Sequence, residues 1–296
     1  MARSPDIPWT PWQPLFEAWK GDKLPNKAGL YRIRRIGFDG VDYIGQTGSG
    51  TMTIKKRMGM LRGVWKDEMP YRDPHTAGPA LWSLRRKYGV DLEVSVAVVE
   101  DTTPNRKGFE ALVTALYRQK SGTSPTVNFG RMPLGFVMSS ANNRRLVEAG
   151  KRFRGGASTA VNQSHQAGLG PTGKLCGEPN GLDWCGFSWS PWQPLDNSAG
   201  LLPKHAAGLY RIAGRSHSSL LYIGEGKIVP RLLAHGKKRN RPDHDQGAIF
   251  RDHSPLRFSY VENNNWQKHH RLEFENDLIA AHILNTGSIP TAQVIG

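Results

Sequence analysis

The sequence predicts an α+β fold that occurs twice in one chain of 296 residues. One observation is local: strand-like runs rich in β-branched residues alternate with turn-rich loops and lead to a helical run with a single apolar stripe. The other is that this series occurs twice in the same order, which indicates a duplicated domain. Each copy is therefore expected to form a small, mainly antiparallel sheet of three strands flanked by helices.

In the first copy, strands are predicted at residues 29–36, 41–45 and 92–99. Gly37, Asp39 and Gly40 supply turn residues between the first two strands. Helices are predicted at residues 53–61, 79–88 and 108–119, and the third strand of the second copy at 256–261. The last helix of the first copy carries its apolar side chains at helical spacing, namely Phe109, Leu112, Val113, Leu116 and Tyr117. Glu110 lies beside this stripe, where its carboxylate can line a cleft.

The repeat itself is carried by four landmarks in one order. The words GLYRI and YIG occur at residues 29–33 and 43–45, and again at 208–212 and 222–224. A segment with two tryptophans and two prolines precedes them at 9–15 and 189–195, and Phe-Glu and Pro-Thr pairs follow. The copies are offset by 180 residues at the first tryptophan, 179 at the tyrosines and 165 from the glutamate onward. The second copy is therefore shorter between its second strand and its last helix.

These landmarks divide the chain into a first domain at 1–132, a basic Gly/Ser-rich connector at 133–185 and a second domain at 186–296. Within the connector a short helix is expected at 144–151, and the stretch after Phe153 has the composition of a linker. Its basic run at 151–156 is either an arm that grips phosphates or a solvated connector. The tryptophans that precede each copy are interpreted as packing residues rather than as a platform for stacked bases.

Composition narrows the partners and the compartment. Forty Lys and Arg against 25 Asp and Glu give a net charge of +15, which favours a polyanionic partner but also fits a solvated basic surface. No apolar run approaches the roughly 20 residues that span a bilayer, and no apolar leader follows Met1 to Pro5, so we expect a cytoplasmic protein that does not enter membranes. Cys176 and Cys185 are interpreted as free thiols, with a metal clip as the alternative.

The repeated words and the residues spaced after them resemble the GIY-YIG nuclease family over about ninety residues of each copy. The first copy has five family positions in order, and its candidate site residues are Tyr31, Tyr43, Arg57, Glu110 and Asn128. The second copy has a comparable set that adds a histidine four residues after its arginine. Its candidate site residues are Tyr210, Tyr222, Arg231, His235 and Glu275. The second copy departs from the pattern at Gln293, where the extra methylene is expected to move the amide, and at Glu225, where the family tends to place a small hydroxyl.

The resemblance implies roles that make chemical sense for phosphodiester hydrolysis. Glu110 and Glu275 would each hold one Mg²⁺, which Mn²⁺ can replace, because Mg²⁺ keeps most of its waters and needs few carboxylates. Arg57 and Arg231 would bind a phosphate oxygen. Tyr31 would act as general base or relay with Tyr43 as its partner, which requires neighbours that lower a phenol pKa from near 10.

The resemblance further implies a DNA endonuclease of the restriction or phage-defence type, whose two copies cut the two strands of a duplex as a single-chain pseudodimer. The chain would act as a monomer, or as a homodimer of such chains. Two alternatives stay open from the sequence: a nicking enzyme whose second copy only positions DNA, and a nucleic-acid-binding protein without hydrolytic activity.

Overall fold

The computed structural model describes residues 7–18, 20, 23–48, 50–200, 203–215 and 220–293, which fall into two compact units. The N-terminal unit holds the described residues up to Arg106 together with Pro125–Ala167. The C-terminal unit holds Lys107–Ser124 and the described residues from Gly168 onward. The segment Lys107–Ser124, which the sequence pattern places in the first copy, therefore packs as part of the unit that contains the second copy. Met1 to Pro5 lie outside the described residues.

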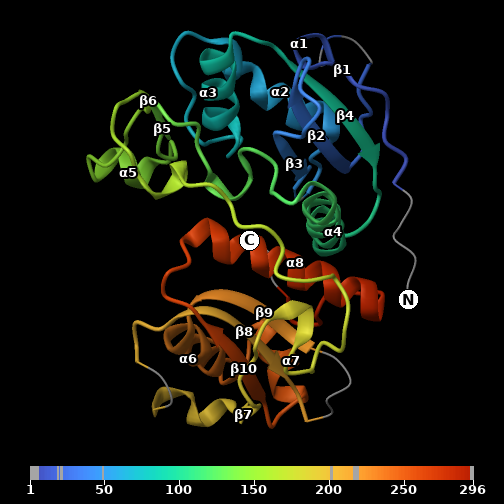
Figure 1. Cartoon of the computed structure of the whole chain (residues 1–296), viewed down its shortest axis with the longest axis vertical. Helices are drawn as coiled ribbons and strands as arrows, with labels where there is room; N and C mark the ends of the chain where they lie inside the picture. Colours follow the sequence, from blue (N-terminus) through green and yellow to red (C-terminus); the bar gives the residue numbers. More distant parts are fainter. Residues whose placement is uncertain are drawn as a thin grey trace. The chain divides into compact units, whose positions relative to one another are not determined.

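The N-terminal unit is built on an antiparallel four-stranded sheet (Figure 1). Its strands are β1 (Gln13–Pro14), β2 (Gly29–Arg35), β3 (Tyr43–Gln46) and β4 (Leu92–Val98), in the order β1-β4-β2-β3. Three helices accompany it, α1 (Leu15–Ala18), α2 (Ile54–Gly59) and α3 (Gly78–Tyr88). In the central strand, Tyr31 lies opposite Gly45 on one side and Val96 on the other. A 3-10 segment, Met60–Trp65, continues the chain after α2.

The C-terminal unit repeats this topology with an antiparallel sheet in the order β7-β10-β8-β9 (Figure 1). The strands are β7 (Gln193–Pro194), β8 (Ala207–Ala213), β9 (Leu220–Lys227) and β10 (Arg257–Glu262), and the helices are α6 (Ile228–Arg239), α7 (Asp245–Asp252) and α8 (Lys268–Thr286). Helix α4 (Thr103–Ser121) begins at the unit boundary and runs into this unit. The prediction of an α+β architecture with antiparallel sheets is confirmed.

Each sheet has four strands rather than the three that were predicted, because the segment before each copy adds a two-residue edge strand. An edge position suits Pro14 and Pro194, since proline has no N–H to donate to a ladder of hydrogen bonds. Side chains fasten the segment in both copies. Ser95 donates to the Thr10 carbonyl at 2.7 Å, and its duplicate Ser259 donates to the Ser190 carbonyl at 2.8 Å.

The tryptophans of these segments hold an arginine of the central strand. The guanidinium carbon of Arg32 lies 4.7 Å from the ring centres of both Trp9 and Trp12. In the second copy Arg211 lies 4.2 Å from Trp189 and 4.8 Å from Trp192, and burial lowers its pKa to about 9. Such cation–π contacts are strongest when they are desolvated. The packing role predicted for these tryptophans agrees with this arrangement.

Successive side chains of β8 point to opposite faces of the sheet, so neighbouring residues of this strand contact different helices. Leu209 belongs to an apolar cluster with Phe274 and Leu278 of α8. Tyr210 belongs to a different cluster, which contains Leu232 of α6 and Phe250 of α7. Tyr210 therefore faces α6, which is the helix that carries Arg231 and His235.

The connector is more ordered than a linker. Strands β5 (Phe136–Val137) and β6 (Gly156–Ala157) pair, and the short helix α5 (Arg144–Glu148) lies between them in sequence. Arg154 forms an ion pair with Glu68 at 2.9 Å and lies 4.4 Å from the Tyr71 ring. The basic run is thus attached to the N-terminal unit through Arg154, while the side chains of residues 151–154 stay exposed.

Both cysteines are free, as predicted, with Cys176 exposed and Cys185 buried. Burial raises the pKa of the Cys185 thiol to about 12, so this thiol is unreactive at neutral pH. Among the described residues, no helix combines the length and apolar character needed to cross a membrane.

Candidate functional site

The second copy brings two tyrosines and a histidine together. Tyr210 on β8 and Tyr222 on β9 have ring centres 6.0 Å apart and nearly parallel planes. His235 of α6 places Nε2 3.0 Å from the Tyr210 hydroxyl, and its ring centre lies 4.5 Å from that of Tyr222. The side chains of Tyr210 and Tyr222 also form a hydrogen bond. The three groups form a polar chain from the buried Tyr210 to the half-exposed Tyr222.

The charge states of Tyr210, Tyr222 and His235 follow from burial. Burial, together with Lys238 and Arg231, lowers the pKa of His235 to about 3, so the imidazole is neutral at pH 7. Burial raises the pKa of Tyr210 well above 10 and that of Tyr222 to about 12. His235 Nε2 pairs with the Tyr210 hydroxyl, and the buried Nδ1 of His235 has no hydrogen-bond partner among the described residues.

A carboxylate adjoins this chain. The Glu275 residue of α8 is partly exposed as a whole, but its carboxyl group is buried. This burial, and secondly repulsion from Glu225, raises the pKa of Glu275 to about 8. Arg231 acts in the opposite direction and lowers the pKa. Glu225 forms an ion pair with Arg271 at 2.9 Å. Glu225, which the sequence marks as a departure from the family pattern, is therefore paired with Arg271 and still acts on the charge of Glu275.

The first copy has an equivalent tyrosine–histidine contact that the sequence did not predict. His75 places Nε2 2.8 Å from the hydroxyl of Tyr31, and its ring centre lies 5.9 Å from that of Tyr43. The backbone N–H of Ala77 donates to His75 Nδ1, which fixes the hydrogen on Nε2. Burial, and secondly Arg57, lowers the pKa of His75 well below 6.5. His75 therefore donates to Tyr31 as a neutral imidazole.

The two histidines come from different places in the chain. His235 lies four residues after Arg231 on α6, a helix of 12 residues. Helix α2 has only 6 residues, and the position four residues after Arg57 is the buried Leu61. The loop between Trp65 and α3 supplies His75 instead, and Arg57 donates to the Pro74 carbonyl of that loop at 3.1 Å. A signal was available, since the first copy contains few histidines and this one stands in the segment that the second copy lacks.

The structure divides the predicted residues of the first copy. Tyr31, Tyr43, Arg57 and Asn128 belong to the N-terminal unit. Glu110 lies on the part of α4 that belongs to the C-terminal unit, where it is partly buried. All five predicted residues of the second copy belong to the C-terminal unit.

The glycine of each YIG word is required by the tyrosines. A Cβ atom at Gly45 would lie 2.6 Å from the Tyr31 hydroxyl oxygen and 2.7 Å from Cε1 of Tyr43. A Cβ atom at Gly224 would lie at the same two distances from Tyr210 and Tyr222. Carbon atoms pack at about 3.5–4.0 Å, so no larger residue fits between the two phenols.

Asn128 and Gln293 make the same contacts, and the expectation that the extra methylene displaces the amide is wrong. Asn128 accepts from Ile44 N at 2.9 Å and donates to Ile44 O at 3.0 Å. Gln293 makes both bonds to Ile223 at 2.9 Å. In each copy the amide pairs with the backbone between the tyrosine and glycine of YIG, so the residue positions the strand that carries the second tyrosine.

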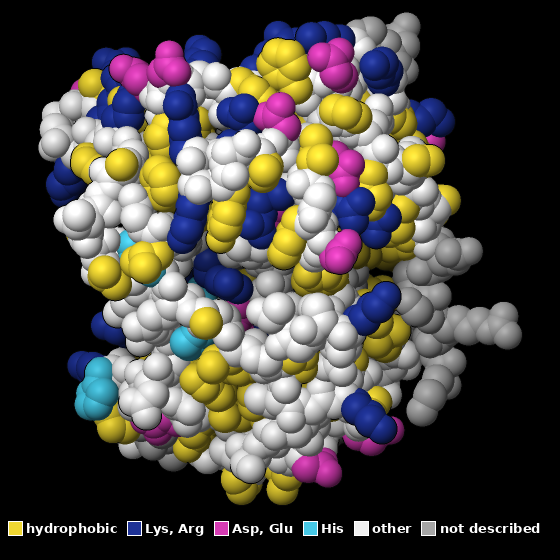
Figure 2. Space-filling model, turned by 45° about the horizontal axis from the view of Figure 1, so that its top comes forward, with side chains coloured by type: hydrophobic (Ala, Val, Ile, Leu, Met, Phe, Trp, Pro, Cys, Tyr) yellow, Lys and Arg dark blue, Asp and Glu magenta, His cyan; other side chains and the backbone are white. Residues whose placement is uncertain are grey.

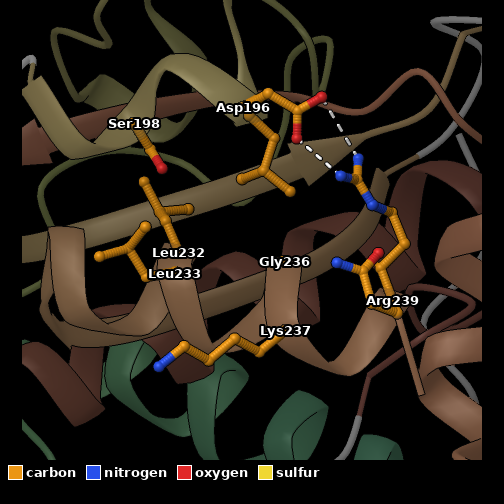
Figure 3. A pocket seen from close by; sticks show the side chains of 9 residues that line it. Asp196, Ser198, Leu232, Leu233, Gly236, Lys237 and Arg239 are labelled. Atoms are coloured by element: carbon orange, nitrogen blue, oxygen red, sulfur yellow. Dashed lines mark hydrogen bonds and ion pairs between the residues drawn. The ribbon is translucent and has the colours of Figure 1, made fainter.

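The structure also contains a pocket on another face of α6 (Figure 3). Its volume is about 220 Å³, and Arg239 and Asp196 form an ion pair at its edge with a 2.7 Å contact. Leu232, Leu233 and Lys237 line it, whereas Arg231 and His235 do not. The predicted site and this pocket therefore use different faces of one helix.

No group of three or more His, Cys, Asp or Glu side chains suited to a metal ion occurs among the described residues. No family model matches the chain, and no significant match was found among curated proteins or solved structures.

Proposed function

We propose that this protein is a metal-dependent DNA endonuclease of the GIY-YIG type with two related sites in one chain. The observation that carries the proposal is the group formed by Tyr210, Tyr222 and His235 beside Glu275 and Arg231. It combines a hydroxyl chain, a carboxylate and an exposed arginine, the residue types that phosphodiester hydrolysis needs for proton transfer, cation binding and phosphate binding.

The donor set fits a hard divalent cation such as Mg²⁺. Glu275 lies near a second carboxylate, Glu225. Its pKa is raised because burial and repulsion from Glu225 outweigh the attraction of Arg231 for its negative charge. A cation favours the ionised form of such a group. Glu275 would hold Mg²⁺, or Mn²⁺ in its place; when bound, the ion would supply charge stabilisation at the scissile phosphate.

The chain's own residues would divide the remaining work. Arg231 is exposed and would bind a non-bridging phosphate oxygen. Tyr222, at the more open end of this group, would contact the attacking water, and Tyr210 would hold Tyr222 in place. His235 would hold Tyr210 in place through the 3.0 Å hydrogen bond between its Nε2 and the Tyr210 hydroxyl. Tyr31, Tyr43, Arg57 and His75 would play the same parts in the first copy.

The charge of the chain supports a nucleic-acid substrate. Its net charge is +15, and Lys and Arg side chains are spread over the face shown in Figure 2, where they outnumber Asp and Glu. Such a surface lowers the free energy of approach to a phosphate backbone, and the affinity then falls steeply with salt. Double-stranded DNA is the substrate expected of a chain with two sites.

The proposal is tested by incubating supercoiled plasmid with the protein in Mg²⁺ or EDTA. Separate Glu110→Ala and Glu275→Ala variants should each convert double-strand cleavage into nicking, with the mutated site slowed by about 10²-fold or more. Glu148→Ala, which removes an exposed carboxylate from a surface ion pair, is the matched control. Binding without metal-dependent cleavage across varied DNA substrates would refute hydrolysis. A silent Glu275→Ala beside an inactive Glu110→Ala would identify a one-site nicking enzyme.

A further inference from the structure

Helices α4 and α8 are duplicates of one another. Both have 19 residues, and their first and last residues are separated by the offset of 165 that relates the copies beyond the glutamate. The glycine after each helix, Gly122 and Gly287, has the same separation and a positive φ, 72° and 80°. Every residue of one helix therefore has a mate in the other, found by adding or subtracting 165.

The two helices pack against each other within the C-terminal unit (Figure 1), and two of their contacts join a residue to its own mate. Asn276 donates from Nδ2 to the carbonyl of Ala111 at 3.0 Å. Ala115 and Ala280 lie in one apolar cluster. A contact between mates is expected on the axis of a two-fold interface.

Further contacts between the two helices occur in mated pairs. Arg118 binds Asp277 through Nε at 2.9 Å and Nη2 at 3.0 Å. The mates of these residues are Ile283 and Leu112, and they too share a cluster. One side of the axis is ionic, and the equivalent contact on the other side is apolar.

The ends of the helices follow the same rule. Ser124 donates to Glu273 Oε1 at 2.7 Å, and the fully buried Arg118 lies 3.6 Å from the same oxygen. The mate of Glu273 is Gly108, where a Cβ would lie 2.5 Å from Ile289 and 3.3 Å from Ile283. Ile289 and Ile283 are the mates of Ser124 and Arg118. A carboxylate therefore meets a serine and an arginine on one side, and a glycine meets two isoleucines on the other.

We propose that α4 and α8 form an isologous helix pair, in which each helix binds its own duplicate and the shared contacts are ionic on one side of the axis and apolar on the other. The partner of this surface is thus a second copy of the same helix, supplied by the same chain. Glu110 and Glu275 are mates and occupy equivalent positions about the axis. The inference concerns assembly and does not rest on nuclease activity.

The ionic side makes the pairing selective. If α8 met another α8, Asp277 would face Ile283 with no cation, and Glu273 would face Ile289. If α4 met another α4, Arg118 would face Leu112 with no carboxylate. A buried charge without a partner is strongly unfavourable, so the charges favour the unlike pair over either like pair.

The test exchanges each polar residue for its mate in the full-length chain. Arg118→Ile alone leaves two buried carboxylates without their cation and should lower the melting temperature by about 10 °C. The quadruple variant Arg118→Ile, Ser124→Ile, Glu273→Gly and Asp277→Leu makes the ionic side a replica of the apolar side. It should recover at least half of the lost melting temperature.

A quadruple alanine variant at the same four positions, which removes the charges and leaves cavities, should recover much less. Arg144→Ile, which breaks an exposed ion pair, controls for the loss of an arginine and should not change the melting temperature. A mate-exchanged variant no more stable than the alanine variant would overturn the isologous arrangement. An Arg118→Ile variant as stable as the parent would overturn the ionic lock. Neither readout depends on DNA cleavage.

Discussion

The glycine between the tyrosines offers the sharpest test of the site geometry. In Gly224→Ala, the new methyl carbon would lie 2.6 Å from Cζ and the hydroxyl oxygen of Tyr210 and 2.7 Å from Cε1 of Tyr222. Relief to ordinary contact requires a displacement of about 1 Å between groups fixed in a buried sheet. Overpacking of this kind costs about 1–3 kcal/mol, which corresponds to a fall of roughly 5 °C in the melting temperature of a unit of this size.

The matched control is Gly236→Ala on α6. A Cβ there meets no atom within 4 Å, and alanine is about 1 kcal/mol better than glycine inside a helix, so this variant should be as stable as the parent or more so. Calorimetry measures both variants, and plasmid cleavage reports whether the displaced phenols cost activity, which we expect to fall in Gly224→Ala alone. Equal stability and equal cleavage in the two variants would refute the argument that the phenols exclude a side chain.

Three further predictions concern buried polar groups. Burial lowers the pKa of His235 to about 3 from 6.5, so between these pH values the unfolded chain binds more protons than the folded chain. Stability that is present above pH 6.5 is therefore lost as the pH falls towards 3. His235→Gln should reduce this loss, measured by urea titrations at pH 7.5 and 4.5, and an unchanged pH dependence would contradict the prediction. Gln293→Leu should cost about 3 kcal/mol, because it leaves the N–H and C=O of Ile223 without partners, whereas Gln293→Glu, which keeps one acceptor, should cost less by the same measurement. Arg211→Leu should destabilise the C-terminal unit more than Arg239→Leu. Arg211 is fully buried among three tryptophans, whereas Arg239 pairs with the exposed Asp196. Equal losses of stability in urea unfolding would count against the cation–π packing.

Local sequence determined much of the architecture. The spacing of β-branched and turn residues located strands β2, β4 and β10 to within one or two residues, because a half-buried strand needs side chains that alternate between core and solvent. The offset between repeated words predicted two sheets of one topology, and both sheets have the same strand order. Helix α4 proved longer than predicted at both ends, since its first turn has no apolar stripe to mark it.

The tertiary structure decided which residues meet. His75 contacts Tyr31 across 44 residues of sequence. It stands out as the one histidine of residues 1–132, but no motif or spacing pairs it with Tyr31, because a hydrogen bond depends on where a loop returns in space. Gln293 replaces Asn128 without loss of its backbone contacts, which only the geometry around Ile223 could reveal. The sequence also placed Glu110 with the first copy, whereas packing places its helix in the C-terminal unit. An apolar stripe shows that a helix is buried, but the surface that buries it is chosen by shape and charge, here by Arg118 meeting Asp277 and Glu273.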